Sequence, residues 1–152
     1  MKRFLIIFLL LTVVLGVMAY FAPKSFAVLV PTFPKKSKVY VYCGWSSLES
    51  VNMGNGYLVE CDAENFYDTL QQCSGIDGIS VKFGGTRQDF DNLIRQFGLS
   101  DDVQMLGELS VVCGNSKLVR GGVILDGQLV NVQIAFDGET VTVGYPLILD
   151  SF

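Results

Sequence analysis

Histidine is absent from this chain of 152 residues. Without an imidazole, the usual Ser-His and Cys-His nucleophile pairs cannot form, and zinc sites that mix cysteine with histidine are excluded. The lysines form no Ser-x-x-Lys motif, and the pairs Gly84-Gly85 and Gly121-Gly122 match neither a phosphate loop nor a dinucleotide-binding fingerprint. The sequence therefore predicts a protein that is not an enzyme and that carries no cofactor and no metal.

Acidic residues are frequent, but they show no spacing that indicates catalysis. The carboxylate pair of a glycosidase must face across a cleft, and closeness in the sequence does not establish that geometry. We interpret the acids of the first half as solvated side chains at a strand end and on a helix face. They are Glu49, Glu60, Asp62, Glu64 and Asp68.

Positive charge is scarce beyond the N-terminus. Residues 28–152 contain 8 basic and 15 acidic side chains, a net charge of −7. A surface of this sign repels phosphate backbones, so nucleic-acid binding is not expected. The only basic cluster, Lys35, Lys36 and Lys38, lies beside two prolines. We interpret residues 28–37 as a linker, with weak binding of the lysines to anionic lipid or a wall polymer as the alternative.

Charge is also missing from Phe4 to Pro23, a run dominated by Leu, Ile, Val and Phe. As a helix, this run can cross a hydrocarbon core of about 30 Å. The small residues Ser25 and Ala27, which follow it, instead fit a signal peptidase site. We therefore expect residues 1–27 to be either a cleaved signal peptide or a retained membrane anchor. In both cases residues 38–152 form one domain outside the cytoplasm, secreted or held at the membrane.

Cysteine is present in an even number, which permits disulfides in an exported chain. No Cys-x-x-Cys unit occurs, so neither a redox motif nor a zinc ribbon is indicated, and the spacings suggest no pairing. Buried free thiols are the alternative, because two of the cysteines lie in predicted apolar strands and one on the apolar side of a predicted helix. The four are Cys43, Cys61, Cys73 and Cys113.

Two strand-helix units are expected in the first part of the domain. Strands are predicted at 38–43 and 56–61, followed by a helix that begins after Asp62 and ends at Gly75. The second unit has a strand at 79–83 and a helix that begins after Thr86 with a capping box, has one apolar face and ends at Gly98. The apolar face consists of Phe90, Leu93, Ile94 and Phe97.

The last third is predicted to be all strand. Asp126-Gly127 and Asp137-Gly138 are strong hairpin signals and would join the last three strands into a meander. The expected fold is α+β, a mainly antiparallel sheet of about five to seven strands with two helices packed on one face. The predicted strands are 104–113, 118–125, 128–136 and 139–143.

Two features are candidates for an interaction surface. The meander has a polar face that is expected to be open to water or to a partner, made of Asn131, Gln133, Thr140 and Thr142. Trp45 lies in a predicted loop from Gly44 to Gly56, where an exposed indole would anchor a partner. The alternative for Trp45 is that it closes one end of the core.

The C-terminal strands resemble those of a known family. The segments Asn131-Val-Gln-Ile-Ala135 and Val141-Thr-Val-Gly-Tyr-Pro-Leu-Ile-Leu149, with the terminal Phe152, are similar to the YwmB family. That family comprises exported proteins of Gram-positive bacteria with an α/β fold likened to the TATA-box-binding protein. The resemblance covers roughly the last 25 residues of the printed sequence, and it implies no site residue and no activity.

The sequence thus predicts a cell-envelope protein that contacts the membrane through its N-terminal segment. We expect the domain to be a non-enzymatic module that binds an envelope protein or a wall polymer. The alternative is a domain that binds a small ligand or a carbohydrate in a pocket formed by the Trp45 loop and the meander. A pocket lined by Trp45 would favour the ligand binder, whereas a flat apolar patch would favour the interaction module.

Overall fold

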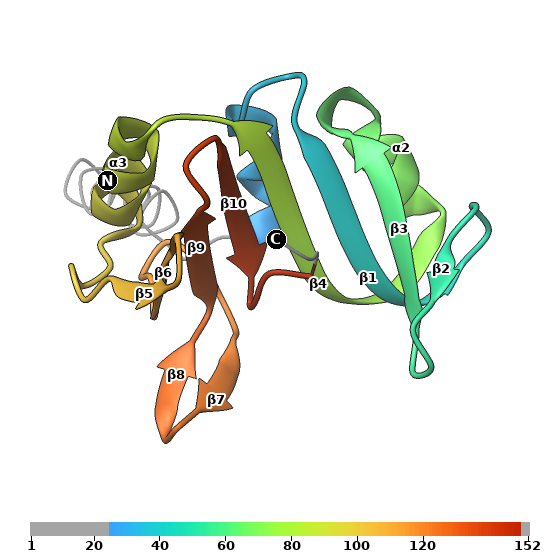
Figure 1. The fold of residues 1–152 in the computed structure, drawn as a ribbon. Coiled ribbons are helices and arrows are strands. Elements are labelled where there is room, and N and C mark those ends of the chain that lie inside the picture. Colours follow the sequence, from blue (N-terminus) through green and yellow to red (C-terminus); the bar gives the residue numbers. More distant parts are fainter. Residues whose placement is uncertain (1–24, 150–152) are drawn as a thin grey trace, which may run out of the picture.

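A computed structural model describes residues 25–149 and shows an α+β fold built on one large antiparallel sheet (Figure 1). Eight strands form this sheet in the order β2-β3-β1-β4-β10-β9-β6-β5, one more than the upper end of the expected range. The strands are β1 (Lys38–Ser46), β2 (Val51–Asn52), β3 (Tyr57–Asp62), β4 (Cys73–Gly84), β5 (Gln104–Leu106), β6 (Leu109–Gly114), β9 (Val132–Phe136) and β10 (Thr140–Tyr145).

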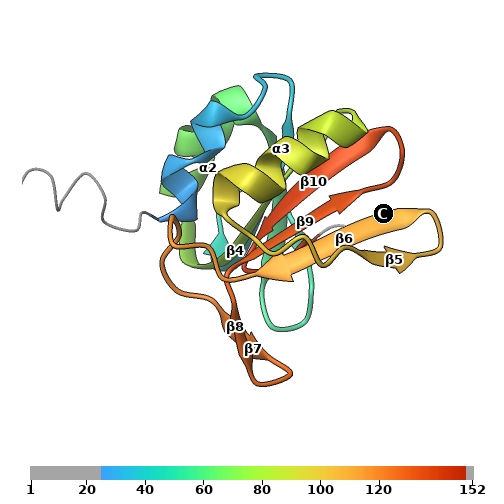
Figure 2. The same cartoon turned by 90° about the vertical axis from the view of Figure 1, so that its left-hand side faces the viewer.

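The helices lie on one face of this sheet, as expected (Figure 2). Alternate residues of the strands, such as Val39, Val41 and Cys43 of β1, point to this face and are fully buried. The helices α2 (Phe66–Gln71) and α3 (Arg87–Phe97) complete the core with their apolar sides. The period of two along the strands thus separates a core face from the opposite face of the sheet.

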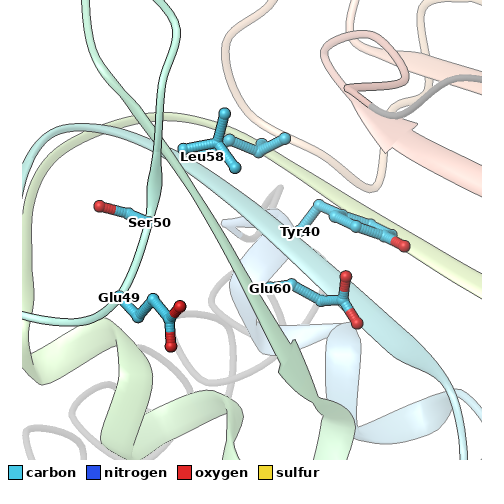
Figure 3. A pocket seen from close by; sticks show the side chains of 6 residues that line it. Tyr40, Glu49, Ser50, Leu58 and Glu60 are labelled. Carbon is cyan, nitrogen blue, oxygen red and sulfur yellow. The ribbon is translucent and has the colours of Figure 1, made fainter.

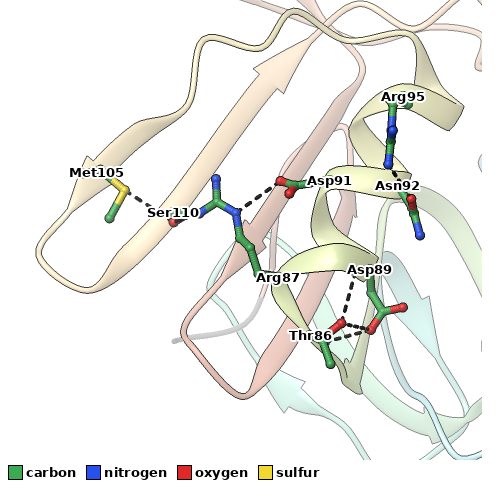
Figure 4. A network of polar contacts seen from close by, with 8 residues as sticks. All are labelled: Thr86, Arg87, Asp89, Asp91, Asn92, Arg95, Met105 and Ser110. Carbon is green, nitrogen blue, oxygen red and sulfur yellow. Dashed lines mark hydrogen bonds and ion pairs between the residues drawn. The ribbon is translucent and has the colours of Figure 1, made fainter.

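Helix α3 confirms the prediction made from its capping residues. The Thr86 amide donates to Asp89 Oδ2 at 2.7 Å, and the Asp89 amide donates to Thr86 Oγ1 at 3.3 Å, which closes a capping box. Gly98 ends the helix in the left-handed conformation, with φ of 64°. The Arg87 side chain donates to Asp91 of the same helix at 3.1 Å and to Ser110 of β6 at 3.0 Å (Figure 4). The bond to Ser110 connects the helix to the sheet.

The first helical segment is shorter than predicted. A 3-10 turn, η3 (Ala63–Asn65), precedes the six residues of α2, and the chain is extended again at Cys73. We expected Gly75 to end this helix, but it lies within β4 with φ of 63°, opposite Gly44 of β1. The apolar spacing of Phe66, Leu70 and Cys73 had therefore extended the predicted helix into a strand.

Residues 28–37 are not a free linker, contrary to the sequence interpretation. Two 3-10 turns, η1 (Phe26–Val28) and η2 (Val30–Thr32), place Phe26, Val30 and Phe33 in the core. Phe26 is 1% exposed and lies against Tyr145 and Phe97, with ring centroids 5.7 and 6.4 Å away. The predicted leader or anchor lies mostly outside the described residues, and no helix within 25–149 has the length and apolarity to cross a bilayer.

The predicted meander does not form one continuous sheet. β7 (Val123–Leu125) and β8 (Gln128–Val130) pair around Asp126-Gly127, which confirms that hairpin, but they form a separate two-stranded sheet. The expected strand 128–136 divides at Asn131, and only its second half, β9, joins the large sheet. The hairpin between β9 and β10, which turns at Asp137-Gly138, is confirmed.

Candidate functional site

The predicted polar face of the meander is not an open surface in the structure. Asn131 is 1% exposed, and its amide group donates to Asn115 Oδ1, Ser116 O and Val119 O at 2.8–3.0 Å. Its Oδ1 accepts from the Ser116 amide at 2.7 Å. Asn131 therefore fastens the loop that precedes the β7–β8 hairpin, and its amide group is satisfied within the fold.

The C-terminal segment covers much of the rest of that face. The Ile148 amide donates to Gln133 Oε1 at 2.9 Å, and the Leu149 amide lies 3.4 Å from Ser80 Oγ. Gly144 lies against the backbone of residues 147 and 148, where no side chain would fit. Thr142 is buried and Thr140 is partly buried beside the Asp137 turn. The four polar residues thus support the fold, and we do not assign a partner to them.

Trp45 lies on strand β1 and not in a loop, and 56% of it is exposed. Strand pairing places Cys43 opposite Ile76 and Trp45 opposite Ser74, so Trp45 and Ile76 are diagonal neighbours on one face. Ile76 is also exposed. Trp45 is not among the residues that line the two hollows beside β3.

Three of the four cysteines lie on adjacent strands, Cys43 on β1, Cys61 on β3 and Cys73 on β4. Burial raises the pKa of Cys43 to about 11, with a further contribution from the neighbouring Cys73 thiol. Burial also raises the pKa of Cys61, and the Cys73 thiol raises it further. Cys113 lies apart on β6 and is exposed. All four thiols are free in the structure, so a disulfide stays a prediction, and Cys43 and Cys73 are the two that contact each other.

The outer edge of β3 is only partly covered by a neighbouring strand. Strand β2 pairs only with Leu58 and Tyr57, so no described strand covers the edge from Val59 to Asp62. Two hollows flank this edge. One, of about 520 Å³, lies on the face opposite the helices and is shown in Figure 3. It is lined by Tyr40, Glu49, Ser50, Val51, Leu58 and Glu60.

The second hollow, of about 440 Å³, lies toward α2 and shares Glu49 and Glu60 with the first. Together the two linings bring four carboxylates to one strand edge, although the sequence had suggested only scattered solvated acids. Lys38 is the one basic residue in either lining that the structure describes. The four carboxylates are Glu49, Glu60, Asp62 and Asp68.

Lys38 of β1 already forms ion pairs with two acidic residues of the adjacent strand β3. Its ammonium lies 2.9 Å from Asp62 and 3.3 Å from Glu60. The hydrogen bond with Asp62, followed by that with Glu60, raises the pKa of Lys38. The edge therefore keeps an excess of negative charge. In residues 25–149 no group of three His, Cys, Asp or Glu side chains is arranged to bind a metal ion.

Comparisons with known protein families, with curated proteins and with solved structures found no match. The resemblance of the C-terminal strands to the YwmB family stays a prediction. The features of this chain that bear on function are the uncovered edge of β3 and the acidic hollows beside it.

Proposed function

We propose that the protein is a non-enzymatic, extracytoplasmic envelope domain that binds an extended, basic polypeptide segment at the outer edge of β3. The observation that carries this proposal is the coincidence of an unpaired strand edge with two hollows, one on each face of the sheet. An extended segment that adds to such an edge gains backbone hydrogen bonds, and its alternate side chains point to opposite faces.

Charge supports a basic protein segment over the other partners that the sequence left open. Four carboxylates and one lysine line the hollows, and residues 28–152 carry a net charge of −7. An anionic wall polymer would be repelled by this edge, whereas lysine or arginine side chains would be attracted. A carbohydrate-binding site around Trp45 has less support, because Trp45 lies outside both linings.

Synthetic peptides test the proposal directly. We expect a peptide of alternating valine and lysine to bind the full chain, and one of alternating valine and glutamate not to bind, in fluorescence anisotropy titrations. Glu49→Gln should weaken binding by up to about fivefold, the effect of about 1 kcal/mol that one exposed charge contributes. Added salt should weaken binding further.

The matched control is Glu139→Gln, which removes the same charge in the β9–β10 turn, far from β3 along the sheet. Equal affinity for both peptides, or an equal loss in both variants, would overturn the proposed site. Amide chemical shifts of Val59 and Cys61 should change on binding, and unchanged shifts there would exclude strand addition at this edge.

A further inference from the structure

The β7–β8 hairpin is an apolar arm that projects from the body of the domain in both views (Figures 1 and 2). Ile124 and Leu129 are cross-strand partners on one of its faces, 67% and 42% exposed. Val123 and Leu125 on the other face are also exposed. An isolated two-stranded hairpin is marginally stable in water, so an arm with two apolar faces indicates a nonaqueous environment for at least one.

The base of this arm lies beside the point at which the chain enters the domain. Phe26 stacks on Tyr145, and the Tyr145 hydroxyl lies so close to Gly121 that a Cβ there would not fit. Gly121 lies two residues before the first residue of β7. Two further exposed apolar side chains, Val28 and Leu118, belong to these same segments. Exposed apolar residues thus occur on η1 and on the loop that leads to the arm as well as on the arm itself.

The sequence that precedes η1 supplies the reason to name the occupant. Phe4 to Pro23 contains no charge and has the length to cross a bilayer. Cleavage after Ala27 would remove Phe26, which is buried in the core. The structure therefore argues against cleavage after Ala27, and a chain that keeps the apolar segment has a membrane next to Ser25.

Local charge agrees with a lipid surface. Residues 109–136 contain only three charged side chains, Lys117, Arg120 and Asp126, so this stretch carries +1 within a domain of −7. Basic residues at the base of an apolar element suit phosphate headgroups, and long basic side chains can reach them from an interfacial position. Asp126 at the turn limits how deeply the hairpin can enter the bilayer, because burying a carboxylate in the hydrocarbon core costs free energy.

We infer that the β7–β8 hairpin lies in the interface of the same bilayer that holds the N-terminal segment, with Ile124 and Leu129 toward the acyl chains. The hairpin and the anchor then hold the domain at two points, which fixes its orientation on the membrane. This inference goes beyond the proposed peptide site and does not depend on it.

A tryptophan reporter tests this placement in the full chain with residues 1–27 intact. In a Trp45→Phe background, Ile124→Trp is compared with Leu106→Trp in β5, a position with similar exposure at 63%. The protein is reconstituted in vesicles of phosphatidylcholine and phosphatidylglycerol, with or without phosphatidylcholine brominated in its acyl chains. We expect loss of fluorescence to bromine and a blue shift for the 124 reporter, and neither for the 106 reporter.

Each other outcome overturns the inference. Equal quenching of both reporters would show that the domain lies on lipid without using the arm. A blue shift at 124 without bromine quenching, growing with protein concentration, would assign the arm to contact between copies of the chain. No change at 124 would leave the arm in water. Far-UV circular dichroism identical to that of the parent excludes misfolding as the cause.

Discussion

Phe26→Ala is the substitution that most directly tests how the N-terminal segment relates to the domain. The Phe26 side chain is fully buried and packs on Phe33, Phe97 and Tyr145, with ring centroids 5.7–6.4 Å away. Truncation of a buried phenylalanine to alanine costs about 3–5 kcal/mol, from lost transfer free energy and the cavity left behind. That is a large part of the roughly 5–15 kcal/mol that stabilises a typical domain.

Urea unfolding of the full chain in mild nonionic detergent, followed by circular dichroism, measures this cost. With a slope of about 2 kcal/mol/M, the urea midpoint should fall by about 1.5–2.5 M. Val28→Ala is the control, because Val28 is exposed in the same turn and its truncation should change stability by less than about 0.5 kcal/mol.

The result bears on processing as well as on stability. A chain that begins at Val28 loses the Phe26 ring and also the hydrogen bond from the Leu29 amide to the Phe26 carbonyl at 2.8 Å. It should therefore be destabilised at least as much as Phe26→Ala. Equal midpoints for Phe26→Ala and Val28→Ala would refute this reasoning, and cleavage after Ala27 would then be compatible with a stable domain.

Two further predictions concern buried groups. Asn131→Ala should destabilise the protein by about 1–3 kcal/mol or more, because the Ser116 amide and two backbone carbonyls lose their buried partner. Asn115→Ala, at an exposed position, should cost less. Equal urea unfolding midpoints for the two variants would contradict the role of Asn131. In maleimide labelling of the native, reduced chain at pH 8, read by mass spectrometry, Cys113 should react first. Cys43 should react only after unfolding, because it is buried and its pKa of about 11 leaves little thiolate; comparable native rates would contradict its burial.

The elements that the sequence predicted well are those whose signals are local. Helix α3 has its cap, its apolar face and its terminal glycine within thirteen residues, from Thr86 to Gly98, so no distant contact is needed to define it. The β9–β10 hairpin is similarly specified by Asp137-Gly138 between apolar strands. Both signals act through backbone geometry close to the residues that carry them.

The errors arose where a tertiary contact decides the outcome. Asn131 was assigned to the polar face of a continuous strand, but its amide is used by the loop at 115–119, which breaks the ladder between β8 and β9. Pro31 and Pro34 suggested a linker, yet Phe26, Val30 and Phe33 bury against the sheet. A proline is also compatible with the first residues of a short 3-10 turn, and Pro31 is the second residue of η2.

The candidate site could not be predicted because it depends on strand order. Glu49, Glu60 and Asp68 are separated by other segments in the chain, and only the position of β3 near one side of the sheet brings them to a common edge. No short pattern states which strand lies outermost or how far its neighbour extends. Strand β2 has only two residues and therefore leaves the rest of β3 uncovered. It lies within a segment that the sequence predicted to be a loop.

The two proposed contacts can operate together because the fold separates them. Four strand spacings lie between β3 and β9, the strand that follows the hairpin, and at about 4.8 Å per spacing this is roughly 19 Å. The Debye length at physiological salt is about 8 Å, so the carboxylates at β3 add little repulsion between the hairpin and anionic headgroups. Salt should then separate the two contacts: peptide binding at β3 weakens as salt rises, whereas burial of Ile124 in lipid persists because it is driven by apolar surface. A domain held at the membrane by its apolar arm would in this way keep its acidic strand edge free for a basic partner.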